Sequence, residues 1–358
     1  MSNAVFEPLL WIVVSLVVLA VGAELLVVGA VAIAERFRVS SLFIGLTIVG
    51  FGTSMPELFT SLAAARLGSS DLAVGNVVGS NVFNIGVVLG LAALVAPIAT
   101  VYSTLRPQLY WALGAALVPA LALGTGGRLG GLAGGVLILG LAAYLWQAFV
   151  MERAAAPADA ARPADASGAA AAAGPAPVAE AVDPAPIGPR TSPPALESAP
   201  RTVGWLASLG RVASGMLLLV LGASRLVDSA ILVARELGAS ELAIGLTVVA
   251  GGTSLPELVT SLVAAVRGES NVAIGNVLGS NVFNAFGILG VSSLLSPQTI
   301  GPQVLGFDTP VLVGMTLLLF PMLRSGDRLD RREAALLLIG YGVYAWALFG
   351  WAPARFGG

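Results

Sequence analysis

The stretches GTSMPELFTS (residues 52–61) and GTSLPELVTS (residues 252–261) decide the fold of this chain, because they are near copies placed 200 residues apart. Each one interrupts a long hydrophobic segment with a proline and a glutamate, two residues that a helix inside a lipid bilayer normally resists. A costly sequence that occurs twice indicates that both copies serve a function.

The repetition extends well beyond these ten residues. Aligned at an offset of 200, residues 41–90 and 241–290 agree at 31 of 50 positions, and both contain a second polar block, GSNVFN, at 79–84 and 279–284. An internal repeat of this length is the strongest organisational signal in the sequence. We therefore predict two homologous halves.

Composition places both halves in a membrane. Hydrophobic residues make up 57% of the 358 residues and charged residues 11%, against about 25% charged in a typical soluble domain. Ten apolar stretches are long enough to cross roughly 30 Å of hydrocarbon, and they lie near 8–32, 40–65, 71–97, 106–125, 129–150, 204–227, 239–265, 271–297, 305–323 and 333–353. The prediction is an all-α integral membrane protein with ten transmembrane helices.

The helices divide into two groups of five. Residues 1–150 form the first half (repeat 41–90), residues 204–358 the second (repeat 241–290), and the Ala/Pro-rich segment 151–203 is predicted to be a disordered cytoplasmic linker. The two GTSxPE motifs are separated by five crossings, and an odd number reverses their direction. The sequence thus predicts inverted repeats, whose substrate site lies near the bilayer midplane.

Charge and residue usage set the orientation and exclude several functions. All 18 basic residues are arginines, and most fall on one side if both termini face outside, as the positive-inside rule favours. Cysteine and histidine are absent, which excludes thiolate metal sites and the usual proton shuttle. No basic cluster indicates nucleic acid, and no nucleophile with a base or metal partner accompanies the acidic residues, so we expect no enzyme.

Oxygen ligands dominate the repeated motifs. On a helix, Thr53 and Ser54 lie four and three residues from Glu57, so these hydroxyls and the carboxylate can share one face. Pro56 lacks the amide proton that would bind the carbonyl of Gly52, which frees backbone oxygens where they line a polar cavity. Carboxylates, hydroxyls, amides and carbonyls without His or Cys favour a hard cation such as Ca²⁺, Na⁺ or Mg²⁺.

The two motif glutamates provide a physical basis for ion exchange. Glu57 and Glu257 together offer a formal charge of −2, which one Ca²⁺ or two Na⁺ would balance. Two like charges in a low dielectric repel each other, so occupancy by cations or protons is favoured. Ions that compete for one pair of carboxylates cannot load together.

The doubled pair GTSxPE and GSNVFN, in two halves of five helices, closely resembles the alpha repeats of the cation/calcium exchanger superfamily, especially prokaryotic sodium/calcium exchangers. The resemblance implies Ca²⁺ coordination by Glu57 and Glu257 with the carbonyls of Thr53 and Thr253, and alternating access in which helices 1 and 6 slide past the other eight. The further ligands it implies, for Na⁺ above all, are Thr53, Ser54, Thr253, Ser254, Ser80 and Ser280, the carbonyls of Gly50 and Ala250, and the motif asparagines Asn84 and Asn284. Some relatives carry aspartate at the position of Asn284, which makes potassium co-transport less expected here.

From the residues and the resemblance together we predict an antiporter that exchanges Ca²⁺ for Na⁺, with no cofactor and no obligate protein partner, in a prokaryotic plasma membrane. Exchange of Ca²⁺ for protons on the same carboxylates stays open, since glutamates can carry protons. A cation channel, which needs a continuous pore, fits the inverted repeats and interrupted helices less well. An intramembrane enzyme could use paired carboxylates, but no nucleophile with a base or metal partner accompanies them.

Overall fold

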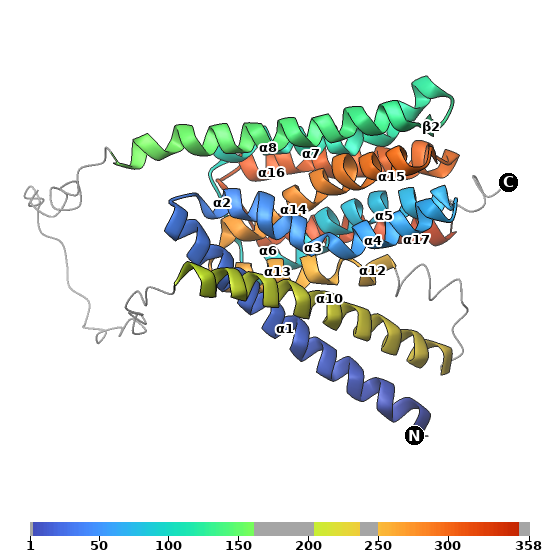
Figure 1. Cartoon of the computed structure of the whole chain (residues 1–358), viewed down its shortest axis with the longest axis horizontal. Helices are drawn as coiled ribbons and strands as arrows, with labels where there is room; N and C mark the ends of the chain where they lie inside the picture. The colour runs from blue at the N-terminus through green and yellow to red at the C-terminus, as the bar shows by residue number, and fades with distance from the viewer. Residues whose placement is uncertain (1–2, 161–203, 237–249, 351–358) are drawn as a thin grey trace, which may run out of the picture.

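Helices account for nearly all regular structure in the computed structural model, which describes residues 3–160, 204–236 and 250–350. The helix α1 (Asn3–Phe37) and the helix α10 (Trp205–Glu236) lie together along one side of the molecule (Figure 1). The helices α7 (Tyr102–Leu117) and α8 (Gly131–Ala160) lie along the opposite side. The helices that carry the repeated motifs lie between these two pairs.

The first half continues from α1 through a series of short, interrupted helices. Its elements are α2 (Ser41–Ile44), the π-helical η1 (Gly45–Val49), α3 (Gly50–Thr53), α4 (Met55–Arg66), α5 (Ser70–Phe83), the π-helical η2 (Asn84–Leu89), α6 (Gly90–Val95), β1 (Ile98–Ala99), α7, the 3₁₀-helical η3 (Val118–Thr125), β2 (Arg128–Leu129) and α8.

The second half repeats this order closely. After α10 its described elements are α12 (Ala250–Gly252), α13 (Leu255–Val266), α14 (Ser270–Val282), the π-helical η5 (Phe283–Ile288), α15 (Leu289–Leu295), β3 (Gln298–Thr299), the π-helical η6 (Val304–Asp308), α16 (Thr309–Arg324), β4 (Arg328–Leu329) and α17 (Arg331–Gly350).

The all-helical membrane fold predicted from the sequence agrees with this structure. Among the described residues, seven helices are long and apolar enough to cross a bilayer, or eight if the bent pair Ser41–Thr53 and Met55–Arg66 forms one span. Two of the ten predicted spans are not in that set: 239–265, which is described only from residue 250, and 333–353, which α17 covers as far as Gly350. The helix α8 continues to Ala160, past the predicted boundary at residue 150, and the rest of the predicted linker lies outside the described residues.

Both GTSxPE motifs break their helices at the serine. Ser54 has φ −81° and ψ 10°, and Ser254 has φ −89° and ψ 10°, so neither residue continues the helix before it. The proline in the first turn of α4 and of α13 removes no intrahelical hydrogen bond, because the first amides of a helix have no intrahelical acceptor. The chain bends by 46° between the two parts of the first broken span.

Two small antiparallel sheets join the halves. In one, β1 pairs with β4 through Ile98 opposite Leu329; in the other, β2 pairs with β3 through Leu129 opposite Gln298. The two pairings are related by an offset of 200, because Ile98 corresponds to Gln298 and Leu329 corresponds to Leu129. The contacts between the halves therefore repeat with the same offset as the sequence.

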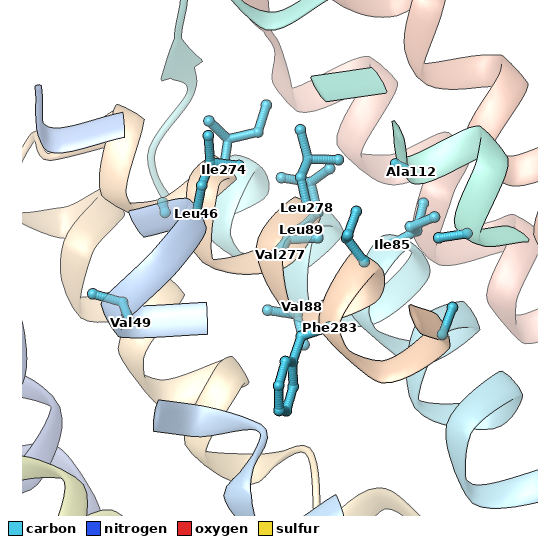
Figure 2. Close-up of a cluster of buried hydrophobic side chains, with 14 of the residues drawn as sticks. Leu46, Val49, Ile85, Val88, Leu89, Ala112, Ile274, Val277, Leu278 and Phe283 are labelled. Atoms are coloured by element: carbon cyan, nitrogen blue, oxygen red, sulfur yellow. The ribbon is translucent and has the colours of Figure 1, made fainter. Parts of the chain in front are cut away.

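Buried aliphatic side chains surround the polar centre. Figure 2 shows Leu46 and Val49 of η1, Val88 of η2 and Val277 of α14 in one cluster, which packs elements of both halves against each other. The pair α1–α10 relies instead on glycine, because a Cβ added at Gly215 would lie 2.7 Å from the backbone oxygen of Gly22. This close approach needs residues without side chains.

Candidate cation site

Glu57 and Glu257 occupy matching positions in the first turns of α4 and α13, and both are fully buried. The helix N-terminus carries partial positive charge, which stabilises a carboxylate in the first turn. The breaks at Ser54 and Ser254 thus create two helix N-termini inside apolar segments, which lower the free-energy cost of burying a carboxylate there.

Each carboxylate accepts a hydrogen bond from the other half of the chain. Ser54 Oγ donates to Glu257 Oε1 at 2.9 Å, and Ser254 Oγ donates to Glu57 Oε1 at 2.8 Å. The sequence predicts only that Ser54 and Glu57 can share one face; in the structure the Ser54 hydroxyl bonds the glutamate of the other half, from its position at the break between α3 and α4. A hydroxyl that donates its proton keeps lone pairs, so both serines can also act as ligands.

Four side-chain oxygens of the predicted ligands are buried without a hydrogen-bond partner. They are Oε2 of Glu57, Oε2 of Glu257, Oδ1 of Asn84 and Oδ1 of Asn284, again two symmetric pairs. Unpaired buried acceptors cost free energy. A set of carboxylate and amide oxygens of this kind suits a hard cation, which would take up their lone pairs.

The other predicted ligands lie close to this centre but make protein contacts. Thr53 Oγ1 donates to Asn276 Oδ1 at 3.0 Å, and Thr253 Oγ1 donates to Asn76 Oδ1 at 3.4 Å. Of the remaining four, Gly50 and Ala250 hold matching positions at the starts of α3 and α12. The two serines depart from symmetry, because Ser80 Oγ donates to Glu57 Oε1 at 3.5 Å and Ser280 Oγ donates to the carbonyl of Gly50 at 3.2 Å.

Asparagines that the motif alone did not single out as ligands position the glutamates. Asn76 Nδ2 donates to the carbonyl of Glu57 at 3.3 Å and to Ser61 Oγ at 2.9 Å. Asn276 makes the same two bonds, with the same distances, to Glu257 and to Ser261. Their presence in both repeats, three residues before GSNVFN, is the sequence signal for this role.

A second asparagine set joins α5 to α14 directly. Asn81 Nδ2 donates to the carbonyl of Asn281 at 3.1 Å, and Asn281 Nδ2 donates to the carbonyl of Asn81 at 3.2 Å. Asn84 Nδ2 donates to Asn281 Oδ1 at 3.1 Å, and Asn284 Nδ2 donates to Asn81 Oδ1 at 3.0 Å. These bonds leave the Oδ1 atoms of Asn84 and Asn284 unpaired.

The ligand chemistry of the site is mixed rather than acidic. Among the described residues there is no group of three or more His, Cys, Asp or Glu side chains that could hold a metal. Two carboxylates surrounded by hydroxyl and amide oxygens give a weaker and less rigid set than an all-carboxylate site. Such a set is compatible with a cation that must also be released.

Known proteins resemble this chain over nearly its whole length. The profile of a family described as sodium/calcium exchanger protein matches the chain twice, over residues 7–150 and 207–350. The putative antiporter CaxA of Alkalimonas amylolytica is 35% identical over 343 residues, which cover 95% of this chain and 98% of the relative. The sodium/calcium exchanger MaX1 of Methanosarcina acetivorans is 32% identical over 360 residues, covering 94% and 97%.

The fold has a solved counterpart. A structure of the sodium-calcium exchanger NCX_Mj, soaked with Na⁺ and Ca²⁺, superposes with a TM-score of 0.73 at 28% identity and covers 97% of this chain and 99% of its own. The duplicated motifs, the broken helices and these matches over nearly the whole length lead to one conclusion: the chain belongs to the sodium/calcium exchanger family.

Proposed function

We propose that the protein is a secondary active antiporter that exchanges Ca²⁺ for Na⁺ by alternating access at a central site built from Glu57 and Glu257. One observation carries the proposal: each half contributes a fully buried carboxylate that accepts a hydrogen bond from a serine of the other half, Ser54 or Ser254. Each carboxylate keeps one oxygen without a partner. Family membership and the names of the relatives support cation exchange.

Charge balance gives the site its exchange behaviour. Glu57 and Glu257 carry a formal charge of −2, which one Ca²⁺ or two Na⁺ neutralise. An unoccupied site would hold two repelling charges away from water, which opposes any movement through the membrane without cargo. Because the two ions use the same oxygens, loading one displaces the other, and the fluxes are coupled.

The proposed ligands extend from the carboxylates to the neighbouring oxygens. Ca²⁺ takes Glu57 and Glu257 with backbone carbonyls, while Na⁺ shares the two carboxylates and also uses the hydroxyl oxygens and backbone carbonyls around them. The full set comprises Glu57, Glu257, Thr53, Thr253, Ser54, Ser254, Ser80, Ser280, Asn84, Asn284, Gly50 and Ala250. Isothermal titration with Ca²⁺ on alanine variants tests each side chain, and unchanged affinity in a variant removes that residue from the set.

The proposed architecture is two inverted five-helix repeats, residues 1–150 and 204–358, with ten membrane crossings and a linker between them. Support comes from the offset of 200 shared by the two family matches, the strand pairs and the serine–glutamate bonds. Orientation, with the termini outside, is testable because the chain lacks cysteine. An impermeant maleimide should label Arg128→Cys in intact cells and leave Arg153→Cys unlabelled; the reverse pattern would invert the topology.

The deciding experiment is ⁴⁵Ca²⁺ uptake into Na⁺-loaded proteoliposomes, compared with vesicles that have only a pH gradient. Wild-type protein should take up Ca²⁺ with the Na⁺ gradient alone, and Glu257→Gln should abolish this uptake because one carboxylate cannot balance Ca²⁺. Glu7→Gln, which changes an exposed carboxylate near the N-terminus, is the matched control. Uptake driven only by the pH gradient would replace Na⁺ by H⁺ as the coupling ion, and no uptake with either gradient would refute Ca²⁺ exchange.

A further inference from the structure

A cleft on the far side of the molecule from α1 and α10 has no place in the exchange mechanism. It has a volume of about 270 Å³ and is lined by Arg106, Pro107, Tyr110 and Trp111 of α7 and by Gln147 of α8. Arg106 and Tyr110 are exposed, so the cleft opens to the outside of the helix bundle. Its volume is near the lower end for small-molecule pockets, about 300 Å³, which fits a small polar group better than a large ligand.

The polar atoms of this cleft are hydrogen-bond donors. Within the part of the chain that the structure describes, Arg106 forms no hydrogen bond or ion pair, so its five N–H groups have no protein acceptor. Trp111 Nε1 donates to Gln147 Oε1, which occupies the amide oxygen and leaves the amide N–H groups of Gln147 available. No carboxylate lines the cleft. An anion with several oxygens, such as a phosphate, matches this donor set.

The position of the cleft indicates where such a phosphate comes from. Arg106 lies in the second turn of α7, at the end of the bundle where Ser40 Oγ donates to Glu152 and where Arg153 stacks on Phe149. Arg106 and Arg153 both lie toward this end, and Tyr110 and Trp111 are aromatic types that are enriched at membrane–water interfaces. Basic clefts between membrane helices at that level bind the headgroups of anionic lipids.

The repeat does not account for these residues. At an offset of 200, Arg106, Tyr110, Trp111 and Gln147 correspond to Gly306, Pro310, Val311 and Ala347. The shared fold and the duplicated cation site therefore do not need this group of side chains. The cleft is a feature of one half alone, which indicates a separate role.

The inner wall of the cleft contacts a helical segment of the second half. The ring of Trp111 contacts Phe286 at 5.8 Å and Tyr144 at 5.6 Å between centroids. Phe286 belongs to η5, the π-helical segment that also contains the predicted ligand Asn284. A group that fixes Trp111 and Gln147 would thus stabilise the packing of α7 against η5.

We propose that the cleft formed by Arg106, Tyr110, Trp111 and Gln147 binds the phosphate of an anionic phospholipid, with Arg106 as the main charge partner. The inference does not depend on which ions the protein exchanges. Its test is a binding and stability measurement on the full chain rather than a transport assay, so the two proposals can fail separately.

The first experiment measures thermal unfolding of the purified protein in detergent with added phosphatidylglycerol or phosphatidylcholine of identical acyl chains. Phosphatidylglycerol should raise the midpoint more than phosphatidylcholine does, by on the order of 5 °C at saturation. Arg106→Gln should lose most of that difference, whereas Arg128→Gln, an exposed arginine outside the cleft, should keep it. An equal lipid effect in Arg106→Gln and wild type would overturn the proposal.

Soluble sn-glycerol 3-phosphate separates a lipid from a free phosphate. At millimolar concentration it should leave the midpoint unchanged; a shift as large as that with phosphatidylglycerol would mean a small-anion site and would refute lipid binding. Should Arg106→Gln fail to fold, tryptophan quenching by brominated lipids in wild type and Trp111→Phe gives a second answer. Brominated phosphatidylglycerol should quench wild type more than brominated phosphatidylcholine, and this excess should disappear in Trp111→Phe; its persistence would place the lipid elsewhere.

Discussion

Replacing Asn81 by alanine tests how the two halves hold together at the centre. The substitution removes two hydrogen bonds: the one from Asn81 Nδ2 to the carbonyl of Asn281, and the one that Asn284 Nδ2 donates to Asn81 Oδ1. Asn281→Ala removes the two symmetric bonds and no others of this set. The two variants therefore lose separate but equivalent interactions.

The magnitude follows from burial. The side chain of Asn284 is fully buried, and a buried donor left without an acceptor costs about 1–3 kcal/mol, to which the second, neutral bond adds about 0.5–1.5 kcal/mol. Polar contacts between membrane helices average about 0.6 kcal/mol, so two of them would give about 1.2 kcal/mol. We expect the sum of the first two terms, about 1.5–4.5 kcal/mol, because the stranded amide is enclosed by protein and cannot find another partner.

Thermal unfolding in detergent measures this loss. Asn81→Ala and Asn281→Ala should each lower the midpoint by on the order of 5 °C. The double variant should lower it further than either single one, although not by the exact sum, because the four lost bonds are distinct but belong to one network. Asn271→Ala, at an exposed position of α14, is the matched control and should stay near wild type. A single variant no worse than that control, or a double variant no worse than either single one, would refute this account.

Three other predictions concern separate parts of the molecule. Ser254→Ala removes the hydrogen bond that positions Glu57, worth at most about 1.5–3 kcal/mol. The Ca²⁺ concentration for half-maximal uptake should therefore rise, by no more than about 10- to 150-fold. Thr260→Val, whose hydroxyl is buried without a partner, should not change it, and equal effects would contradict the role of Ser254. Gly215→Val would place a Cβ 2.7 Å from a backbone oxygen of α1 and should lower the unfolding midpoint. Gly210→Val should not, because a Cβ added there meets no neighbouring atom within 4 Å. Similar midpoints for the two variants would argue against close α1–α10 packing. Burial raises the pKa of Glu269 above its usual 4.5, so its contribution to stability is complete below pH 4.5 and is lost as the pH rises through the raised value. Glu269→Gln should flatten the fall of the unfolding midpoint as the pH rises above 4.5, and an unchanged slope would contradict this.

Much of the fold follows from repetition and composition. Long apolar stretches cannot satisfy their backbone groups in a membrane unless they form helices, so most spans and both breaks at the GTSxPE motifs are readable from the sequence. The sequence also points to Glu57 and Glu257 as the central pair, because acidic residues inside apolar segments are costly and both copies retain one. The roles of the single ligands remain predictions.

Contacts between the halves could not be predicted. Helical spacing places Ser54 beside Glu57, but a backbone torsion of ψ 10° ends the helix at that serine and turns its hydroxyl to Glu257. The asparagine bonds between α5 and α14 depend in the same way on how two helices approach. The cleft at Arg106 is invisible in the sequence, since its five lining residues come from two helices and follow no repeat.

The hydrogen bond that each half donates to the glutamate of the other half has a consequence for biosynthesis. Ser254, which donates to Glu57, follows it by 197 residues. At translation rates of about 5–20 residues per second, Ser254 is therefore synthesised roughly 10–40 s after Glu57. During that time the first half must hold an acidic side chain in the membrane without its hydroxyl donor from the second half. The nascent first half is therefore an incomplete folding unit, and retention of Glu57 in the membrane before the second half arrives depends on Ser80 and the first turn of α4.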